Sequence, residues 1–116
     1  MSGVKVFAKK KHLDDVVCGV PFQVTVVVIA GENEANVELC CEIEGESCFF
    51  SPQNEKTICK ERFIISQSDG YVEKRFRPLI NCDPADTYQT LLNITATDLE
   101  TAEFDNTIVR LRIQCF

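Results

Sequence analysis

The run Thr107-Ile-Val109-Arg-Leu111-Arg-Ile113-Gln-Cys115 alternates apolar and polar residues more strictly than any other part of the chain. A period of two places successive side chains on opposite faces of a β-strand, so this run predicts a strand with one buried face. The same alternation occurs at 22–26, where the apolar run continues to Ile29, and at 37–43. These three segments indicate sheets that cover a common core.

Weaker strand patterns fill the rest of the 116 residues. Four further strands are expected at 4–9, 58–66, 71–77 and 88–97. An Asp69-Gly70 pair between 58–66 and 71–77 is typical of a tight hairpin turn. Helical periodicity is not convincing in any window of ten or more residues. The sequence therefore predicts an all-β protein, a single seven-stranded antiparallel sandwich domain spanning 1–116.

One short motif suggests which kind of sandwich this is. Asp83-Pro-Ala-Asp-Thr-Tyr88 leads directly into a predicted strand and resembles the corner before the sixth strand of immunoglobulin-like domains. The resemblance implies an immunoglobulin/fibronectin-III-like fold in which the Tyr88 hydroxyl bonds to nearby backbone. The alternative is that Tyr88 is simply an inward aromatic at the start of a strand. The predicted second and sixth strands lack cysteine and the chain lacks Trp, so the antibody-type inter-sheet disulfide is not expected.

Charge and hydropathy limit the partners. The net charge of −6 and a pI near 4.7 disfavour nucleic acid, whose affinity depends on Lys and Arg. The longest apolar stretch is much shorter than the ~20 residues of a membrane helix, so no membrane insertion is expected. The first residues do not resemble a signal peptide, which slightly favours the cytoplasm. An extracellular location remains open if the chain is a processed or excised domain.

Acidic residues gather in three predicted connections. If successive strands reverse direction, the connections 31–36, 66–70 and 97–106 meet at one end of the sandwich. They contain seven carboxylates and no Lys or Arg: Glu32, Glu34, Asp69, Asp98, Glu100, Glu103 and Asp105. Three interpretations remain open, namely a solvated rim, a docking surface for a basic partner, and a Ca²⁺ site made of loop oxygens.

Seven cysteines are the most unusual feature of the composition. Two of them, Cys40 and Cys41, lie in a predicted strand and point to opposite faces. Five are expected at the end opposite the acidic loops: Cys18, Cys48, Cys59, Cys82 and Cys115. These five suit free thiols, one or two disulfides, or a structural Zn²⁺ site, although the chain has no C-x-x-C pair. The odd number leaves at least one thiol unpaired within a monomer.

Two apolar features are candidate protein contacts. Phe49 and Phe50 are adjacent in an extended connection, so one of them is expected at the surface, unless both serve to cover the base of the core. On the strands, Val27, Ile29 and Leu91 occupy outward positions, where they offer a sheet face for dimerisation or for packing on another domain.

Catalytic motifs are lacking. The single histidine, His12, is expected at the surface, and the chain contains no Gly-rich phosphate loop, G-x-S-x-G or H-E-x-x-H motif. The sequence therefore favours a non-enzymatic module without a cofactor that binds another protein through its end loops or an outer sheet face. One alternative is a secreted, disulfide-stapled structural module that binds calcium at the acidic loops. A cysteine-based redox or metal-carrying protein is another.

Overall fold

A computed structural model describes residues 3–31, 34–51, 55–66, 68 and 70–116. These residues contain ten strands and no helix, and hence no helix long and apolar enough to cross a membrane. The strands are β1 (Lys5–Ala8), β2 (His12–Val17), β3 (Val24–Ile29), β4 (Ala35–Ile43), β5 (Cys48–Phe50), β6 (Thr57–Ile65), β7 (Tyr71–Phe76), β8 (Ile80–Cys82), β9 (Thr87–Asp98) and β10 (Phe104–Gln114).

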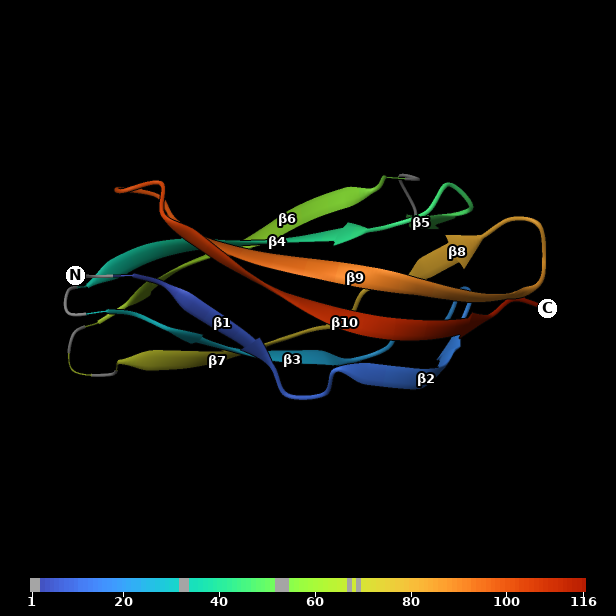
Figure 1. The fold of residues 1–116 in the computed structure, drawn as a ribbon, viewed down its shortest axis with the longest axis horizontal. Helices are drawn as coiled ribbons and strands as arrows, with labels where there is room; N and C mark the ends of the chain where they lie inside the picture. The colour runs from blue at the N-terminus through green and yellow to red at the C-terminus, as the bar shows by residue number, and fades with distance from the viewer. Residues whose placement is uncertain (1–2, 32–33, 52–54, 67, 69) are drawn as a thin grey trace.

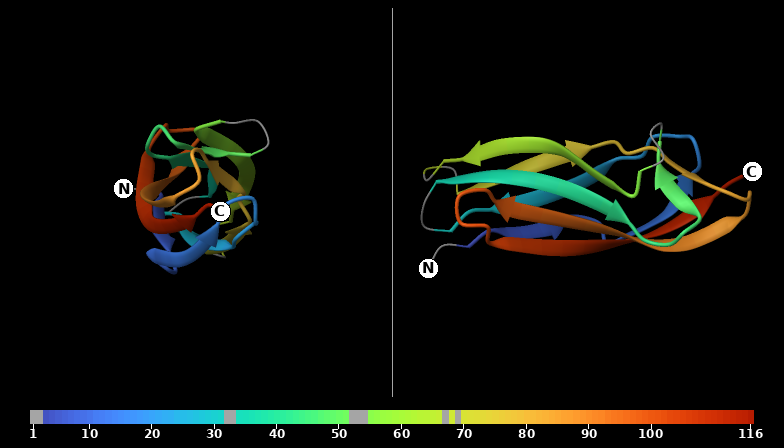
Figure 2. Two further views of the ribbon diagram at one scale, coloured as in Figure 1. Left: turned by 90° about the vertical axis from the view of Figure 1, so that its right-hand side faces the viewer. Right: turned by 90° about the horizontal axis from the view of Figure 1, so that it is seen from above.

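The strands form two facing sheets and one short ribbon (Figures 1 and 2). The small sheet has the order β1-β3-β7, the large sheet has the order β2-β10-β9-β4-β6, and β5 pairs with β8. The molecule is elongated, with principal extents of 47 × 23 × 18 Å. The β9–β10 connection lies at the end where the chain begins, and the C-terminus lies at the other end (Figure 1). This arrangement agrees with the alternating directions expected from the sequence.

Residues that alternate between apolar and polar in the sequence alternate between the core and the solvent in the structure. On β10, Val109, Leu111 and Ile113 are at most 2% exposed, and the intervening Arg110 and Arg112 face solvent. β9, β4 and β3 bury every second residue in the same manner. The buried residues of both sheets belong to one cluster, so apolar burial holds the two sheets together.

The expected count of seven strands is wrong, because ten are present among the described residues. The first strand is followed by a second, β2, which crosses to the large sheet and pairs in parallel with β10. Consecutive Asp14 and Asp15 interrupt the alternation of β2, so the sequence pattern did not predict this strand. Leu111 pairs with Leu13 and Ile113 pairs with Val16, so β2 has one more residue than β10 between these pairs, as in a β-bulge. The other two additional strands are β5 and β8, each of three residues.

The corner before β9 has the expected geometry. The Tyr88 hydroxyl donates a hydrogen bond to the carbonyl oxygen of Pro84, and the Asp83–Pro84 peptide bond is cis. Tyr88 is half-buried and packs against the core. The contact fixes the segment that leads into the long strand β9.

Replacing Tyr88 by Phe removes this hydrogen bond and retains the ring. We expect the free energy of unfolding to fall by about 1 kcal/mol, the usual contribution of one hydrogen bond. Urea denaturation measures the change. Tyr71→Phe is the matched control, because Tyr71 is 61% exposed. Equal effects of the two substitutions would contradict the assigned role of Tyr88.

Candidate functional site

The outer face of the small sheet carries an apolar patch formed by Phe7, Val27, Ile29 and Tyr71. The strand register brings these residues together, because Phe7 pairs with Val27 and Ile29 pairs with Tyr71. Phe7 is 49% exposed, Ile29 37% and Tyr71 61%. Val27 is half-buried between its neighbours. Large apolar side chains gathered at the surface are typical of contact sites.

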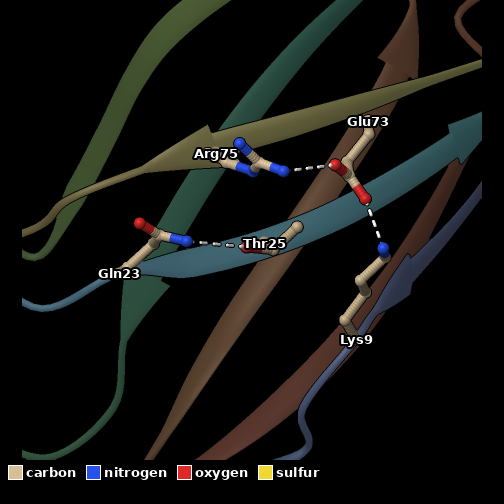
Figure 3. Close-up of polar contacts among 5 residues, drawn as sticks. All are labelled: Lys9, Gln23, Thr25, Glu73 and Arg75. Atoms are coloured by element: carbon tan, nitrogen blue, oxygen red, sulfur yellow. Dashed lines mark hydrogen bonds and ion pairs between the residues drawn. The ribbon is translucent and has the colours of Figure 1, made fainter.

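Charged side chains lie beside the apolar patch on the same face, and Figure 3 shows the polar contacts among them. The Glu73 carboxylate on β7 reaches across β3 to the Lys9 ammonium, just beyond β1, and also accepts a hydrogen bond of 3.0 Å from Arg75. Gln23 donates to the Thr25 hydroxyl at 3.4 Å on the same face. The hydrogen bond from Lys9 is the main reason that the pKa of Glu73 lies below its ordinary value. A single carboxylate therefore joins the outer strands of this sheet.

Among the described residues, the charged side chains that border the apolar patch are mainly cationic. Lys5 pairs with Ile29 in the strand register, and Lys9 and Arg75 flank Glu73. These four side chains comprise three cations and one anion, although the whole chain has a net charge of −6. The summed charge of these four side chains is thus opposite in sign to the net charge of the protein.

The ion pair between Lys9 and Glu73 predicts how the Glu73 carboxyl titrates. Because the folded pKa of Glu73 is lowered, its contribution to stability is present above the unfolded pKa and is lost as the pH falls through the folded pKa. Lys9→Ala should move the Glu73 pKa up towards its ordinary value, as measured by NMR titration of the side-chain carboxyl carbon. Lys10→Ala is the control and should leave the titration unchanged. A Glu73 titration that does not respond to Lys9→Ala would contradict the assigned pairing.

The outward residues predicted from the sequence divide between two faces. Val27 and Ile29 belong to the apolar patch, whereas Leu91 faces outward from the large sheet. Leu91 lies in a shallow depression of about 580 Å³, whose other lining residues include His12, Asp14, Gln89, Arg110 and Arg112.

Phe7 and Tyr71 of the apolar patch were not predicted from the sequence. The alternation of 4–9 and 71–77 shows that both point outward, but their proximity to Ile29 requires the strand order.

The structure places the described acidic candidates at one end, and two of them have local roles. Asp105 accepts a hydrogen bond of 2.9 Å from the Val6 backbone N–H, which ties β10 to β1. Asp98 accepts from the backbone N–H groups of Glu100 and Thr101 and shapes the β9–β10 turn. Glu34, Asp98 and Glu100 line a cavity of about 90 Å³. Glu103 is exposed, and Glu32 and Asp69 lie outside the described residues.

Calcium is not expected to raise the melting temperature through the acidic loops at this end. A Ca²⁺ ion takes six to eight oxygen ligands. Among the described residues, the groups of three or more converging potential ligands all contain cysteine, and none is formed by the acidic loops. We expect the melting temperature to be the same with millimolar CaCl₂ and with matched MgCl₂. A rise specific to calcium that is lost in Glu100→Gln would support a calcium site instead.

Six of the seven cysteines form disulfides in this structure. Cys18 pairs with Cys115, and Cys48 pairs with Cys82, all at the end expected from the sequence. Cys59 does not join them. It is the cross-strand neighbour of Cys40 and forms the third disulfide on the outer face of the large sheet.

The seventh cysteine, Cys41, is buried and free. Burial raises the pKa of its thiol to about 12, so the thiol stays protonated and unreactive at neutral pH. Cys41 faces the core while Cys40 faces outward, as the alternation of this strand predicts. It therefore acts as a small apolar core residue.

Phe49 and Phe50 have different environments. Phe50 is 2% exposed and covers the core, which makes it unavailable for a protein contact. Phe49 is half-buried, with the Lys56 ammonium 4.9 Å from the centre of its ring. The pair consequently offers less contact surface than the sequence suggests.

Comparisons with known proteins add similarity of shape alone. The sequence matches no family model and no curated protein. A PapD-like domain of human CEP192 matches 96% of this chain and 84% of its own, with 8% identity and a TM-score of 0.47. The sporulation control protein Spo0M of Bacillus subtilis matches 99% of this chain and 50% of its own, with 13% identity and a TM-score of 0.42. The bacterial hydrophobin BslA matches 97% of this chain and 95% of its own, with 5% identity and a TM-score of 0.41.

Proposed function

We propose that this domain is a non-enzymatic interaction module that binds a protein partner through the outer face of the small sheet. The observation that carries the proposal is the apolar patch of Phe7, Val27, Ile29 and Tyr71, which three adjacent strands hold in register. Aromatic and branched apolar side chains on a rigid sheet lose little conformational entropy on binding. The patch also has the polar border that protein interfaces commonly show.

The charges specify the chemistry of the partner. Lys5, Lys9 and Arg75 border the patch and, among the described residues there, outnumber the carboxylate of Glu73. Two copies of this face would bring cations opposite cations, which disfavours a symmetric homodimer. The partner is therefore a protein surface with an apolar centre and carboxylates at its rim.

A photo-crosslinking amino acid at position 71 tests this proposal. The crosslinked protein from an extract of the source organism is identified, produced in pure form and measured by calorimetry against matched variants. Ile29→Glu should weaken binding by about 10- to 100-fold, since a central contact typically contributes 1–3 kcal/mol. Ile108→Glu should leave binding unchanged, because Ile108 is similarly exposed, at 42%, on the large sheet. Raising the salt concentration should also slow association.

Two results would overturn the proposal. One is a partner whose affinity falls equally with Ile29→Glu and Ile108→Glu, because binding would not then depend on the small sheet. The other is reversible dimerisation in sedimentation velocity that Ile29→Glu abolishes, because a second copy would then be the occupant. Circular dichroism and melting curves establish that each variant is folded.

The disulfides favour a second candidate, a secreted, disulfide-stapled structural module. Disulfides form and persist mainly in oxidising compartments, and three are present here. This candidate has the same small-sheet face as the first. It differs in requiring an oxidising compartment, whereas the first candidate does not require one. Alkylation under denaturing conditions of protein taken from the source organism, before any reductant is added, distinguishes the two because it also reaches the buried Cys41. A single alkylated cysteine supports the secreted module, and seven contradict it.

A further inference from the structure

Four cysteines from distant parts of the sequence meet at the C-terminal end of the sandwich. The sulfur atoms of Cys18, Cys82 and Cys115 all lie within 4.8 Å of one another. The fourth, Cys48, forms a disulfide with Cys82, although its sulfur atom does not belong to this group of three. Two independent disulfides do not require such proximity between the pairs. The Cys40–Cys59 bridge, by contrast, has the Glu38 carboxylate as its one further nearby ligand among the side chains that the structure describes.

We propose that the reduced protein binds one Zn²⁺ ion through the thiolates of Cys18, Cys48, Cys82 and Cys115. Structural zinc sites are tetrahedral, with Zn–S distances of ~2.3 Å and hence sulfur separations of ~3.8 Å. The sulfur atoms of Cys18, Cys82 and Cys115 already lie within 4.8 Å of one another, so small side-chain rotations bring them to this separation, and release of the Cys48–Cys82 bond frees Cys48 Sγ to turn towards them. The site is independent of the small-sheet face and of any partner bound there.

The backbone holds these cysteines in place without help from the disulfides. Cys48 and Cys82 are paired residues of the β5–β8 ladder, which the bond from Asp83 N–H to the Ser47 carbonyl extends. The N–H of Cys18 bonds to the carbonyl of Gln114 at 3.0 Å.

Two further backbone bonds complete this framework. The N–H of Cys115 donates to the Asp86 carbonyl at 2.9 Å, and the N–H of Gly19 donates to the Ile80 carbonyl at 3.0 Å, which links the Cys18 segment to β8. Reduction of the disulfides therefore leaves the four sulfur atoms close together.

Burial and charge also suit a closed metal site. Cys48 is 2% exposed and the other three cysteines are half-buried. A zinc ion with four thiolates has a net charge of −2, and a nearby cation stabilises it. The Lys56 ammonium donates to the backbone carbonyls of Cys48 and Gly45, which places a positive charge beside the site.

Formation of the site begins with reduction. A trialkylphosphine donates two electrons to each disulfide, so the S–S bond breaks. One water molecule supplies the oxygen of the phosphine oxide and the two protons of the new thiols. Zn²⁺ then replaces the four thiol protons, which pass to the buffer.

Titration of the phosphine-reduced protein with Co²⁺, followed by Zn²⁺, tests the site. One equivalent of Co²⁺ should give the intense visible absorption of a tetrahedral thiolate complex, and one equivalent of Zn²⁺ should abolish it. Zn²⁺ should also raise the melting temperature of the reduced protein. Cys82→Ser should lose the tetrahedral spectrum. The matched control Cys40→Ser/Cys59→Ser removes the other disulfide pair and should keep both effects.

Two outcomes would overturn the proposal. A reduced wild-type protein that is folded by circular dichroism and gives no tetrahedral spectrum has no such site. Binding that survives Cys82→Ser but is lost in Cys40→Ser/Cys59→Ser would place the metal at Glu38, Cys40 and Cys59 instead. If Cys82→Ser does not fold when reduced, Cys115→Ser provides the same comparison, because Cys115 lies near the end of the chain.

Discussion

The antiparallel ladder between β9 and β10 is the constraint on which the rest of the structure depends. It runs through eleven residue pairs, from Thr97 opposite Phe104 to Thr87 opposite Gln114. Its inner face supplies residues that are almost completely buried, and its flanks support β4 and β2. Because this ladder extends along the sandwich, its two ends determine which loops meet. Acidic residues gather at one end, and four cysteines gather at the other.

Much of the architecture could be predicted from the sequence, because alternation reports directly on which face of a strand is buried. The strict pattern of 107–115 predicted β10 and its inner face, and the corner motif predicted the Tyr88 hydrogen bond. β2 could not be predicted in this way, since Asp14 and Asp15 interrupt the period. The strands β5 and β8 have three residues each, too few to show a period.

Pairing between strands was the information that the sequence lacked. Alternation shows that Val27 and Ile29 point outward, but only the order β1-β3-β7 places Phe7 and Tyr71 beside them. The same limitation explains Cys59, which was expected with the end cysteines and instead lies opposite Cys40. Contact surfaces and disulfides both depend on neighbours across strands, so local sequence patterns predict their residues better than their partners.

The apolar patch and the cysteine pairs both depend on the strand register, and disulfide mapping tests that register. Protein prepared without reductant is alkylated, digested and analysed by mass spectrometry. We expect three linked peptide pairs, Cys18 with Cys115, Cys40 with Cys59 and Cys48 with Cys82, and a single free thiol at Cys41 that is alkylated only after unfolding. A bond between Cys59 and Cys48, or rapid alkylation of Cys41 in the folded protein, would contradict it.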